Sequence, residues 1–118
     1  MTGRIVEIGT QRFTQVICKD KPGQVDAGYE YQVVGVETGE NFTEIYFQKG
    51  PVGETGVNGC HNEDLIAIVL DRLRAFQKGD YACRENAIAI TKLEEALHRL
   101  NDRTADRSAR GVMGTSVK

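Results

Sequence analysis

The stretch "NEDLIAIVLDRLRAFQKGDYACRENAIAITKLEEALHRL", from Asn62 to Leu100, decides the fold of this 118-residue chain. Its apolar residues recur three and four positions apart, which is the spacing of an amphipathic helix, and the joint "KGDYAC" interrupts them once. The pattern therefore predicts two helices joined as an antiparallel hairpin. We expect the first helix to have Asn62 as its N-cap and to stop near Gly79, and the second to start near Cys83.

The apolar side chains cover more of these two helices than packing on each other requires. In the first helix they are Leu65, Ile66, Ile68, Val69, Leu70, Leu73 and Phe76. In the second helix, Ile90, Leu93, Leu97 and Leu100 share one stripe, and Ile88 lies off it. A helix packed on one side needs an apolar stripe of only about 100°. We therefore expect a homo-oligomer, assembled through the helices.

Toward the N-terminus the pattern changes from helical to β. The segments "RIVEI", "FTQVICK", "YEYQVVGVE" and "FTEIYFQ" are rich in Val, Ile, Tyr, Phe and Thr, as strands are. In the last segment Thr43, Ile45 and Phe47 alternate with more polar positions, which is typical of a strand with one packed face. The predicted fold class is α+β, with a small N-terminal antiparallel β-sheet followed by a C-terminal antiparallel helical hairpin.

The chain length predicts a single domain over residues 1–118. We divide it into a β-sheet region (1–49), a Gly-rich connector (50–61), the helical hairpin (62–110) and a tail (111–118). The connector carries Gly50, Gly53, Gly56 and Gly59. These triplets are too few for collagen, and no Lys-Ser or Lys-Thr follows them as in a phosphate-binding loop. The spacing favours a flexible linker, although its backbone amides near the helix start are a second, weaker anion candidate.

Composition excludes several classes of protein. The 40% hydrophobic and 27% charged residues are those of an ordinary globular chain. We expect no membrane partner, because there is no apolar run of about 18 residues and no signal-peptide core. The net charge of −2 is divided between a basic end from Arg99 onward and an acidic remainder, which argues against DNA or RNA as a partner. Three cysteines without a CxxC pair predict free thiols in a cytosolic protein.

No constellation of catalytic or metal-binding residues stands out in the sequence. His61 and His98 are far apart, and neither has an obvious set of further ligands. The nucleophile and zinc motifs GxSxG and HExxH are absent, and the adjacent Glu94 and Glu95 point to different helix faces. We therefore expect no catalytic residues, no metal and no cofactor.

Four arginines recur at helical spacing near the end of the predicted hairpin: Arg99, Arg103, Arg107 and Arg110. Steps of four, four and three residues place them on one stripe of a helix. They could pair with acids on the same helix, as the i,i+4 spacing of Glu95 and Arg99 suggests, or they could bind an anion. Local acids match Arg103 and Arg107 least completely, so these two are the anion candidates.

Residues Val57 to Thr115 resemble the helical-hairpin domain of the phage Thoeris anti-defence (Tad) sponge proteins, and anti-CBASS sponges share this kind of hairpin. The resemblance is carried by "CREN" followed by "AIAITKLEEAL", by "RTADR" and by "RGV" and "GT" around Met113. It covers about half of the chain. The β half in front of the hairpin fits the sponge type that has an N-terminal sheet.

The resemblance implies a non-enzymatic protein of the host cytoplasm. Such a protein binds the cyclic ADP-ribose isomer (gcADPR type) that Thoeris defence makes as a signal, and hides it without cleaving it. Some members also hold cyclic trinucleotides at separate sites. The family forms dimers and hexamers, with pockets between subunits. The implied ligand-binding residues are Phe76 (adenine stacking), Asn86 (ligand holding), Arg103 (phosphate) and, as lining of this or a second pocket, Arg84, Arg107 and Arg110.

Two other functions stay open on the residues alone. A small oligomeric regulator or nucleic-acid-binding protein is weakened by the negative net charge and by the lack of a recognition-helix pattern. A cyclic-nucleotide hydrolase is weakened by the missing metal set and general base. Phe76 has an alternative too, because it stands at the end of an amphipathic stripe and could be a core residue.

Overall fold

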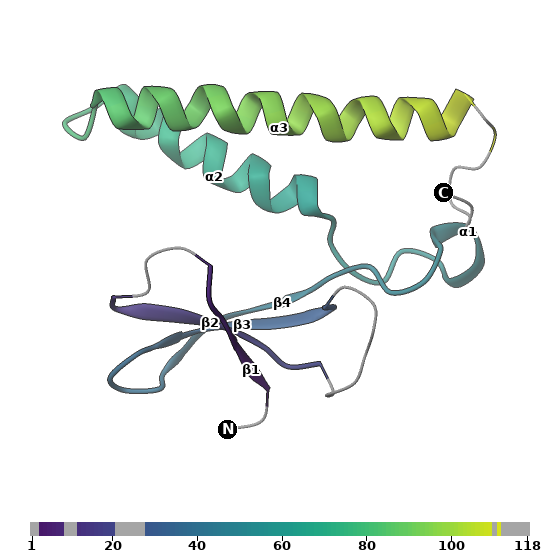
Figure 1. Cartoon of the computed structure of the whole chain (residues 1–118), viewed down its shortest axis with the longest axis horizontal. Helices are drawn as coiled ribbons and strands as arrows, with labels where there is room; N and C mark the ends of the chain where they lie inside the picture. Colours follow the sequence, from purple (N-terminus) through teal and green to yellow (C-terminus); the bar gives the residue numbers. More distant parts are fainter. Residues whose placement is uncertain (1–2, 9–11, 21–27, 110, 112–118) are drawn as a thin grey trace. The chain divides into compact units, whose positions relative to one another are not determined.

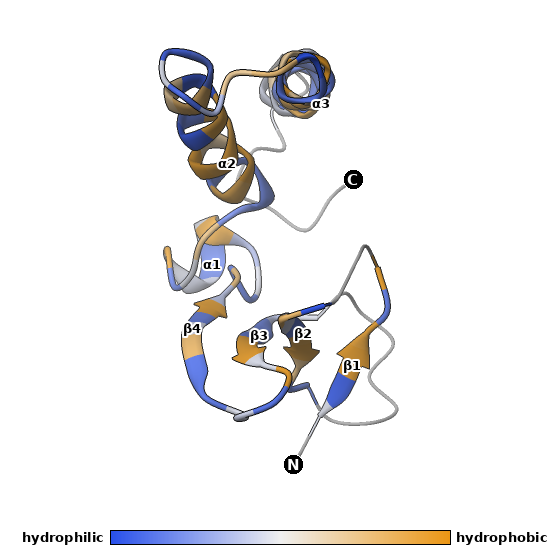
Figure 2. Ribbon diagram, turned by 90° about the vertical axis from the view of Figure 1, so that its left-hand side faces the viewer, coloured by the Kyte–Doolittle hydropathy of each residue, from blue (hydrophilic) through white to orange (hydrophobic). Residues whose placement is uncertain are grey.

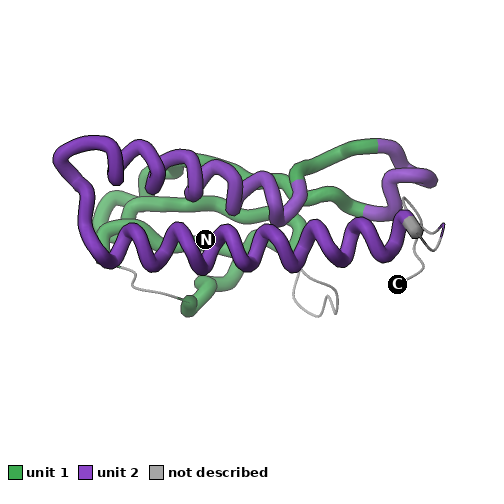
Figure 3. Tube along the Cα trace, turned by 90° about the horizontal axis from the view of Figure 1, so that it is seen from above, with its two compact units in different colours: residues 1–49, 57–60 green, residues 50–56, 61–118 purple. Residues whose placement is uncertain are grey.

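The computed structural model describes residues 3–8, 12–20, 28–109 and 111. The chain divides into two compact units (Figure 3). The sheet unit comprises residues 1–49 and 57–60, and the hairpin unit comprises residues 50–56 and 61–118. The α+β class predicted from the sequence is confirmed, since four antiparallel strands precede a pair of helices. The organisation as a single domain stays a prediction.

The sheet unit is a meander of four strands (Figure 1). They are β1 (Arg4–Val6), β2 (Thr14–Cys18), β3 (Glu30–Gly35) and β4 (Asn41–Tyr46). Each strand pairs antiparallel with the next, so Ile17 on β2 lies between Ile5 and Gln32 on its two neighbours. Gly39 has φ 71 in the loop between β3 and β4, a conformation that glycine adopts without strain.

The small core of this unit comes from the two central strands. Ile17, Cys18 and Val34 are buried, because β2 and β3 each have neighbours on both sides. The alternation predicted along residues 42–48 is present in part: Ile45 is half-buried, whereas Phe42 and Tyr46 are exposed.

The connector predicted at residues 50–61 contains ordered structure. Its middle forms the one-turn helix α1 (Val52–Thr55). Its end returns to the sheet unit, where Cys60 pairs in parallel with Phe47. Gly59 makes that approach possible, because a Cβ at this position would lie 2.4 Å from the main-chain carbonyl carbon of Phe47.

The hairpin unit contains the two long helices predicted from the sequence, α2 (Asn62–Gln77) and α3 (Arg84–Ala109). The N-cap prediction is wrong by one residue. His61 is the N-cap of α2, and Asn62 is already helical. The reason is a capping contact from within the first turn, where the Asp64 Oδ2 accepts the His61 N–H at 2.8 Å.

An ion pair joins the two helices, and α2 carries one buried leucine. Leu70 is only 3% exposed, and Arg74 Nη2 lies 2.8 Å from Glu94 Oε2. Apolar residues extend along α2 (Figure 2). Three of the helical apolar side chains remain exposed in the single chain: Ile68, Val69 and Ile88. The hairpin thus leaves apolar surface uncovered, as the width of its apolar pattern predicts.

The helix α3 is ten residues longer than α2, which adds about 15 Å of helix at 1.5 Å per residue. Its C-terminal turns extend past the start of α2 (Figure 1). We call this part, residues 100–109, the overhang. It reaches beyond α2 (Figure 1), and Arg103 within it is exposed to solvent.

Candidate functional site

Two aromatic rings and a guanidinium gather where the hairpin turns, at residues 72–86, which we call the hairpin tip. Phe76, in the last turn of α2, has its ring centroid 5.3 Å from that of Tyr81, and the two ring planes are inclined by 48°. The guanidinium carbon of Arg72 lies 5.3 Å from the Phe76 centroid, one helical turn earlier. Phe76 is half-buried by these neighbours, whereas Tyr81 is 72% exposed. The tip therefore combines an aromatic surface with a cation.

Hydrogen bonds hold the main chain of the tip in place. The side-chain Nδ2 of Asn86 donates to the carbonyl oxygen of Tyr81 at 3.0 Å. The Cys83 N–H donates to Oε1 of Gln77 at 2.8 Å, and the Gly79 N–H donates to the carbonyl oxygen of Phe76 at 3.2 Å. These bonds connect the end of α2, the joint and the first turn of α3. Asn86 is thus connected to the aromatic pair by its hydrogen bond to the main chain of Tyr81.

Arg84 does not join this cluster. It is exposed and stands two residues before Asn86 on α3. At about 100° per residue, two helical positions are turned by roughly 200°, which puts Arg84 on nearly the opposite side of the helix. Of the residues implied by the family resemblance, the hairpin tip brings together Phe76 and Asn86 and leaves Arg84 apart from them.

Arg103 and Arg107 lie on the overhang of α3. Arg103 is seventeen residues beyond Asn86 on one continuous helix, or about 25 Å along its axis. No arginine side chain spans that distance, so Arg103 and the tip of the same chain cannot hold one small ligand. Arg110 lies outside the described residues.

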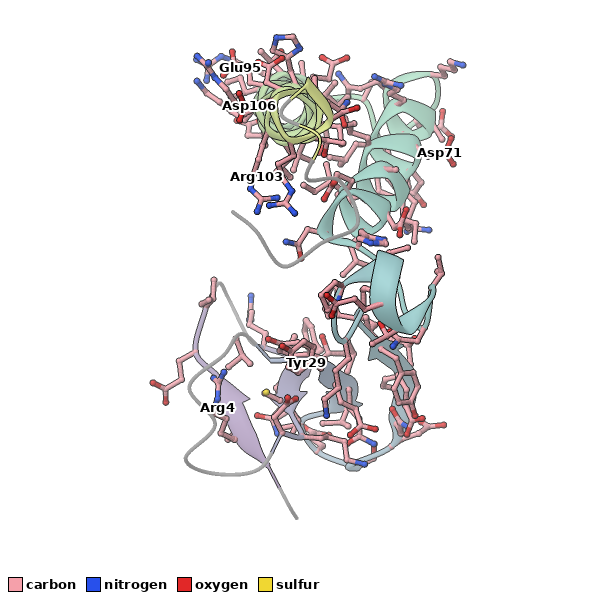
Figure 4. All side chains as sticks on the ribbon, turned by 90° about the vertical axis from the view of Figure 1, so that its right-hand side faces the viewer. Arg4, Tyr29, Asp71, Glu95, Arg103 and Asp106 are labelled. Atoms are coloured by element: carbon pink, nitrogen blue, oxygen red, sulfur yellow. The ribbon has the colours of Figure 1, made fainter. Side chains whose placement is uncertain are left out.

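Arg103 has no ion-pair partner within the part of the chain that the structure describes. Its side chain leaves α3 on a different side from Glu95 and Asp106 (Figure 4). The neighbouring Asp102 instead lies 3.5 Å from Nε2 of His98. An exposed guanidinium without a local carboxylate retains its donors for an external anion.

The ion pair between Glu95 and Arg99 that the sequence spacing suggests is not formed among the described residues. The acid that pairs is the preceding one, because Glu94 faces Arg74 on α2. Adjacent side chains on a helix point about 100° apart around its axis, so Glu94 faces α2 and Glu95 does not.

Sequence reasoning missed two members of the hairpin tip. Arg72 stands four positions before Phe76, a spacing that places a cation beside an aromatic ring on one helix face. Tyr81 is the single aromatic residue of the joint "KGDYAC" and could have been noticed for that reason. Its closeness to Phe76 depends on the conformation of the joint, which the spacing of apolar residues in the sequence does not predict.

A second polar cluster lies on the sheet unit. Glu44 accepts hydrogen bonds from the Tyr46 hydroxyl at 2.7 Å, from Asn41 at 3.2 Å and from Gln32 at 3.4 Å. These bonds, that from Tyr46 foremost, lower the pKa of the Glu44 carboxyl, and the same contact raises the pKa of the Tyr46 phenol. The Glu44 carboxylate accepts from all three donors within the sheet, so we interpret this cluster as structural.

Three further findings concern the described residues alone. No group of three or more His, Cys, Asp and Glu side chains among them is placed to hold a metal ion. No helix among them is long and apolar enough to cross a membrane. The cysteines Cys18, Cys60 and Cys83 are free thiols.

Comparison with known proteins places the hairpin in a family. The family model described as "Acb2/Tad1, hairpin domain" matches residues 39–105, more than half of the chain. A protein of Bacillus phage SBSphiJ7, described as "Thoeris anti-defense 1", is 62% identical over 74 residues. The match covers 63% of this chain and 52% of that protein, so it spans about half the length of the relative.

Proposed function

This chain belongs to the Acb2/Tad1 hairpin-domain family, and on that premise we propose that it sequesters a nucleotide-derived immune signal. The signal is a cyclic ADP-ribose isomer of the gcADPR type. The protein binds and sequesters this molecule without cleaving it, so that the molecule does not activate Thoeris defence in the host cytoplasm. The single observation that carries this proposal is the 62% identity over 74 residues to an anti-defence protein. The protein uses no cofactor and no catalytic residue.

The aromatic surface at the hairpin tip supports a nucleotide as the ligand. Phe76 supplies a ring against which the adenine packs, and base–aromatic stacking contributes about 1–3 kcal/mol. Asn86 belongs to the same hairpin tip, and its Nδ2 donates a hydrogen bond to the Tyr81 carbonyl oxygen. Its Oδ1 is thereby left as an acceptor for the ligand.

The exposed guanidinium of Arg103, which forms no ion pair with the described residues, supports a phosphate-bearing ligand. A charge-assisted hydrogen bond to phosphate is worth about 1.5–3 kcal/mol. Arg107 follows one turn later on the same stripe, and with Arg84 and Arg110 it lines this pocket or a second one. A second pocket of this kind would take cyclic trinucleotides, the other ligand class of the family resemblance.

The separation along α3 makes the ligand site a property of the assembly. Because Arg103 and Phe76 of one chain are too far apart for one ligand, the overhang of one copy must meet the tip of another. The exposed Ile68, Val69 and Ile88 provide apolar surface for such an assembly. We therefore propose a homo-oligomer, either a dimer or a hexamer, whose pockets form between chains.

Tight binding also requires such a closed pocket. A sponge effective at nanomolar signal concentrations needs about −12 kcal/mol of binding free energy. One stacked ring and one arginine supply at most about half of that, so the remainder has to come from a preorganised pocket that buries most of the ligand.

The proposal is tested by recovering the ligand intact. Purified protein is mixed with gcADPR, unbound small molecules are removed on a desalting column, and the protein is heat-denatured. Mass spectrometry of the released material is expected to return the intact cyclic molecule in stoichiometric amount. A hydrolysed, linear product would establish an enzyme instead. Absence of both species would overturn sequestration of this signal.

A salt titration distinguishes the sponge from a nucleic-acid-binding protein. Binding of gcADPR involves two phosphates and is expected to weaken only gently as the salt concentration rises. Duplex DNA, offered as the competing ligand, is expected not to bind. Steeply salt-dependent retention of the duplex would favour the nucleic-acid alternative.

A further inference from the structure

The most exposed aromatic side chain of the hairpin tip is Tyr81, which no prediction from the sequence assigned to the site. Its side chain is 72% exposed, whereas Phe76 is half-buried. Arg72 lies over one face of the Phe76 ring, and Tyr81 is tilted against the same ring. Most of the aromatic surface that the tip offers to a ligand therefore belongs to Tyr81.

The main chain around Tyr81 is held at several points, although its ring is open to solvent. The Tyr81 carbonyl oxygen accepts from Nδ2 of Asn86 at 3.0 Å, and the following Ala82 N–H donates to the Gly79 carbonyl oxygen at 3.3 Å. Cys83, two residues on, is bound by Gln77. An exposed aromatic ring on a held main chain loses little conformational freedom on binding, which favours a role in recognition over one in the fold.

We propose that Tyr81 is a second aromatic contact to the adenine of the ligand, beside Phe76. The inference rests on the proposed function and deepens it by adding a specificity-determining residue. A centroid distance of 5.3 Å leaves no room for a base between the rings. Their 48° inclination instead opens a V, in which a purine stacked on one ring meets the second ring at its edge.

This geometry gives Asn86 a positioning role. Its Nδ2 donates to the Tyr81 carbonyl oxygen, so Asn86 holds the main chain from which the Tyr81 ring projects. The arrangement favours flat purine bases, because both rings contact the base only when the base is planar and wide enough to span them.

The test is calorimetric titration of the full chain with gcADPR. Tyr81→Ala is expected to weaken binding by ~10- to 100-fold, the range for loss of one stacked base. Tyr81→Phe keeps the ring and is expected to recover most of the lost affinity. Asp80→Ala is the matched control for the joint: it removes an exposed neighbour and leaves both rings, and it is expected not to weaken binding.

A fluorescence measurement gives a second, independent readout. The sequence contains no tryptophan, so Tyr81→Trp introduces a single tryptophan, which can be excited selectively over the remaining tyrosines, and keeps an aromatic ring at the site. Stacking of adenine on that ring is expected to quench its emission in a saturable manner, with a midpoint that agrees with the calorimetric one. Emission unchanged at saturating ligand would overturn the contact.

The outcomes separate this inference from the proposed function. If the wild type binds gcADPR and Tyr81→Ala binds equally well, the function stands and the role of Tyr81 is refuted. If Tyr81→Phe loses as much as Tyr81→Ala, the hydroxyl rather than the ring carries the effect, and stacking is refuted. An equal loss in Asp80→Ala would assign the effect to the joint. If the wild type itself fails to bind, the function and the inference fall together.

Discussion

Asn86 and Arg103 lie on the same helix, about 25 Å apart along its axis. One belongs to the hairpin tip with Phe76 and Tyr81, and the other belongs to the overhang beyond α2. Both are implied ligand-binding residues, yet a molecule of the size of cyclic ADP-ribose does not reach from one to the other within a chain. A ligand that contacts both residues must therefore lie between two copies of the chain, and the predictions below test this.

Replacing Arg103 is expected to weaken ligand binding without affecting the fold. The side chain is exposed and has no ion-pair partner among the described residues, so Arg103→Ala should leave the melting temperature unchanged. Loss of a charge-assisted bond to phosphate should raise the Kd by about 10- to 100-fold. Calorimetric titration and a thermal melt measure both quantities. Wild-type affinity in this variant would remove Arg103 from the site.

Phe76→Ala is expected to weaken binding by a similar factor of ~10 to 100, since it removes one stacking surface. It also deprives Tyr81 and Arg72 of their contact with the ring. The oligomer should persist on a sizing column, because Phe76 stands at the tip and not on the exposed face formed by Ile68 and Val69. Affinity lost only in step with dissociated subunits would mean that Phe76 is an assembly residue.

Mixing two defective chains is expected to restore binding. If each pocket takes its tip from one copy and its overhang from another, an assembly of Phe76→Ala and Arg103→Ala chains contains some pockets with neither substitution. Random two-chain assembly after joint refolding should regenerate about a quarter of the pockets at wild-type affinity. Each variant refolded alone is the control. A mixture that binds no better than its components would place the whole site within one chain.

Leu70→Ala is expected to destabilise the hairpin by about 2–5 kcal/mol, because it leaves a cavity at the buried position of α2. Chemical denaturation followed by circular dichroism at 222 nm measures the free energy of unfolding. Lys92→Ala, an exposed substitution on α3, serves as the control and should change stability by less than about 0.5 kcal/mol. Equal effects of the two substitutions would show that Leu70 is not part of the core.

The lowered pKa of Glu44 predicts a pH dependence of stability on the acid side. A carboxyl with a lowered pKa stabilises the folded state above its ordinary pKa, near 4.5, and this contribution is lost as the pH falls through the lowered value. The difference in melting temperature between wild type and Glu44→Gln should therefore be largest at neutral pH and should vanish in acid. A carbon-detected NMR titration with the Glu44 midpoint at or above 4.5 would contradict the assignment.

Local patterns in the sequence are sufficient to predict the four strands and the two long helices of this fold, but not the one-turn helix α1. The helical spacing from Leu65 to Leu100 requires two amphipathic helices, and the alternation around Ile45 requires a half-buried strand. These predictions hold because side-chain periodicity is set by backbone geometry within a few residues. The family resemblance rests on residues of the same helices. The sequence therefore also predicts the family membership that the comparison confirms.

The tertiary structure decided what the periodicity leaves open. His61 caps α2 in place of Asn62 because Asp64 bonds back to its N–H. Glu94 pairs in place of Glu95 because only it faces Arg74 on the other helix. Tyr81 meets Phe76 because the joint folds back and Asn86 holds it there. Each of these contacts depends on how the chain is folded around the residues, and the local spacing of side chains does not predict it. For that reason the sequence determined the two helices and the sheet, and the folded chain alone determined which of their residues meet.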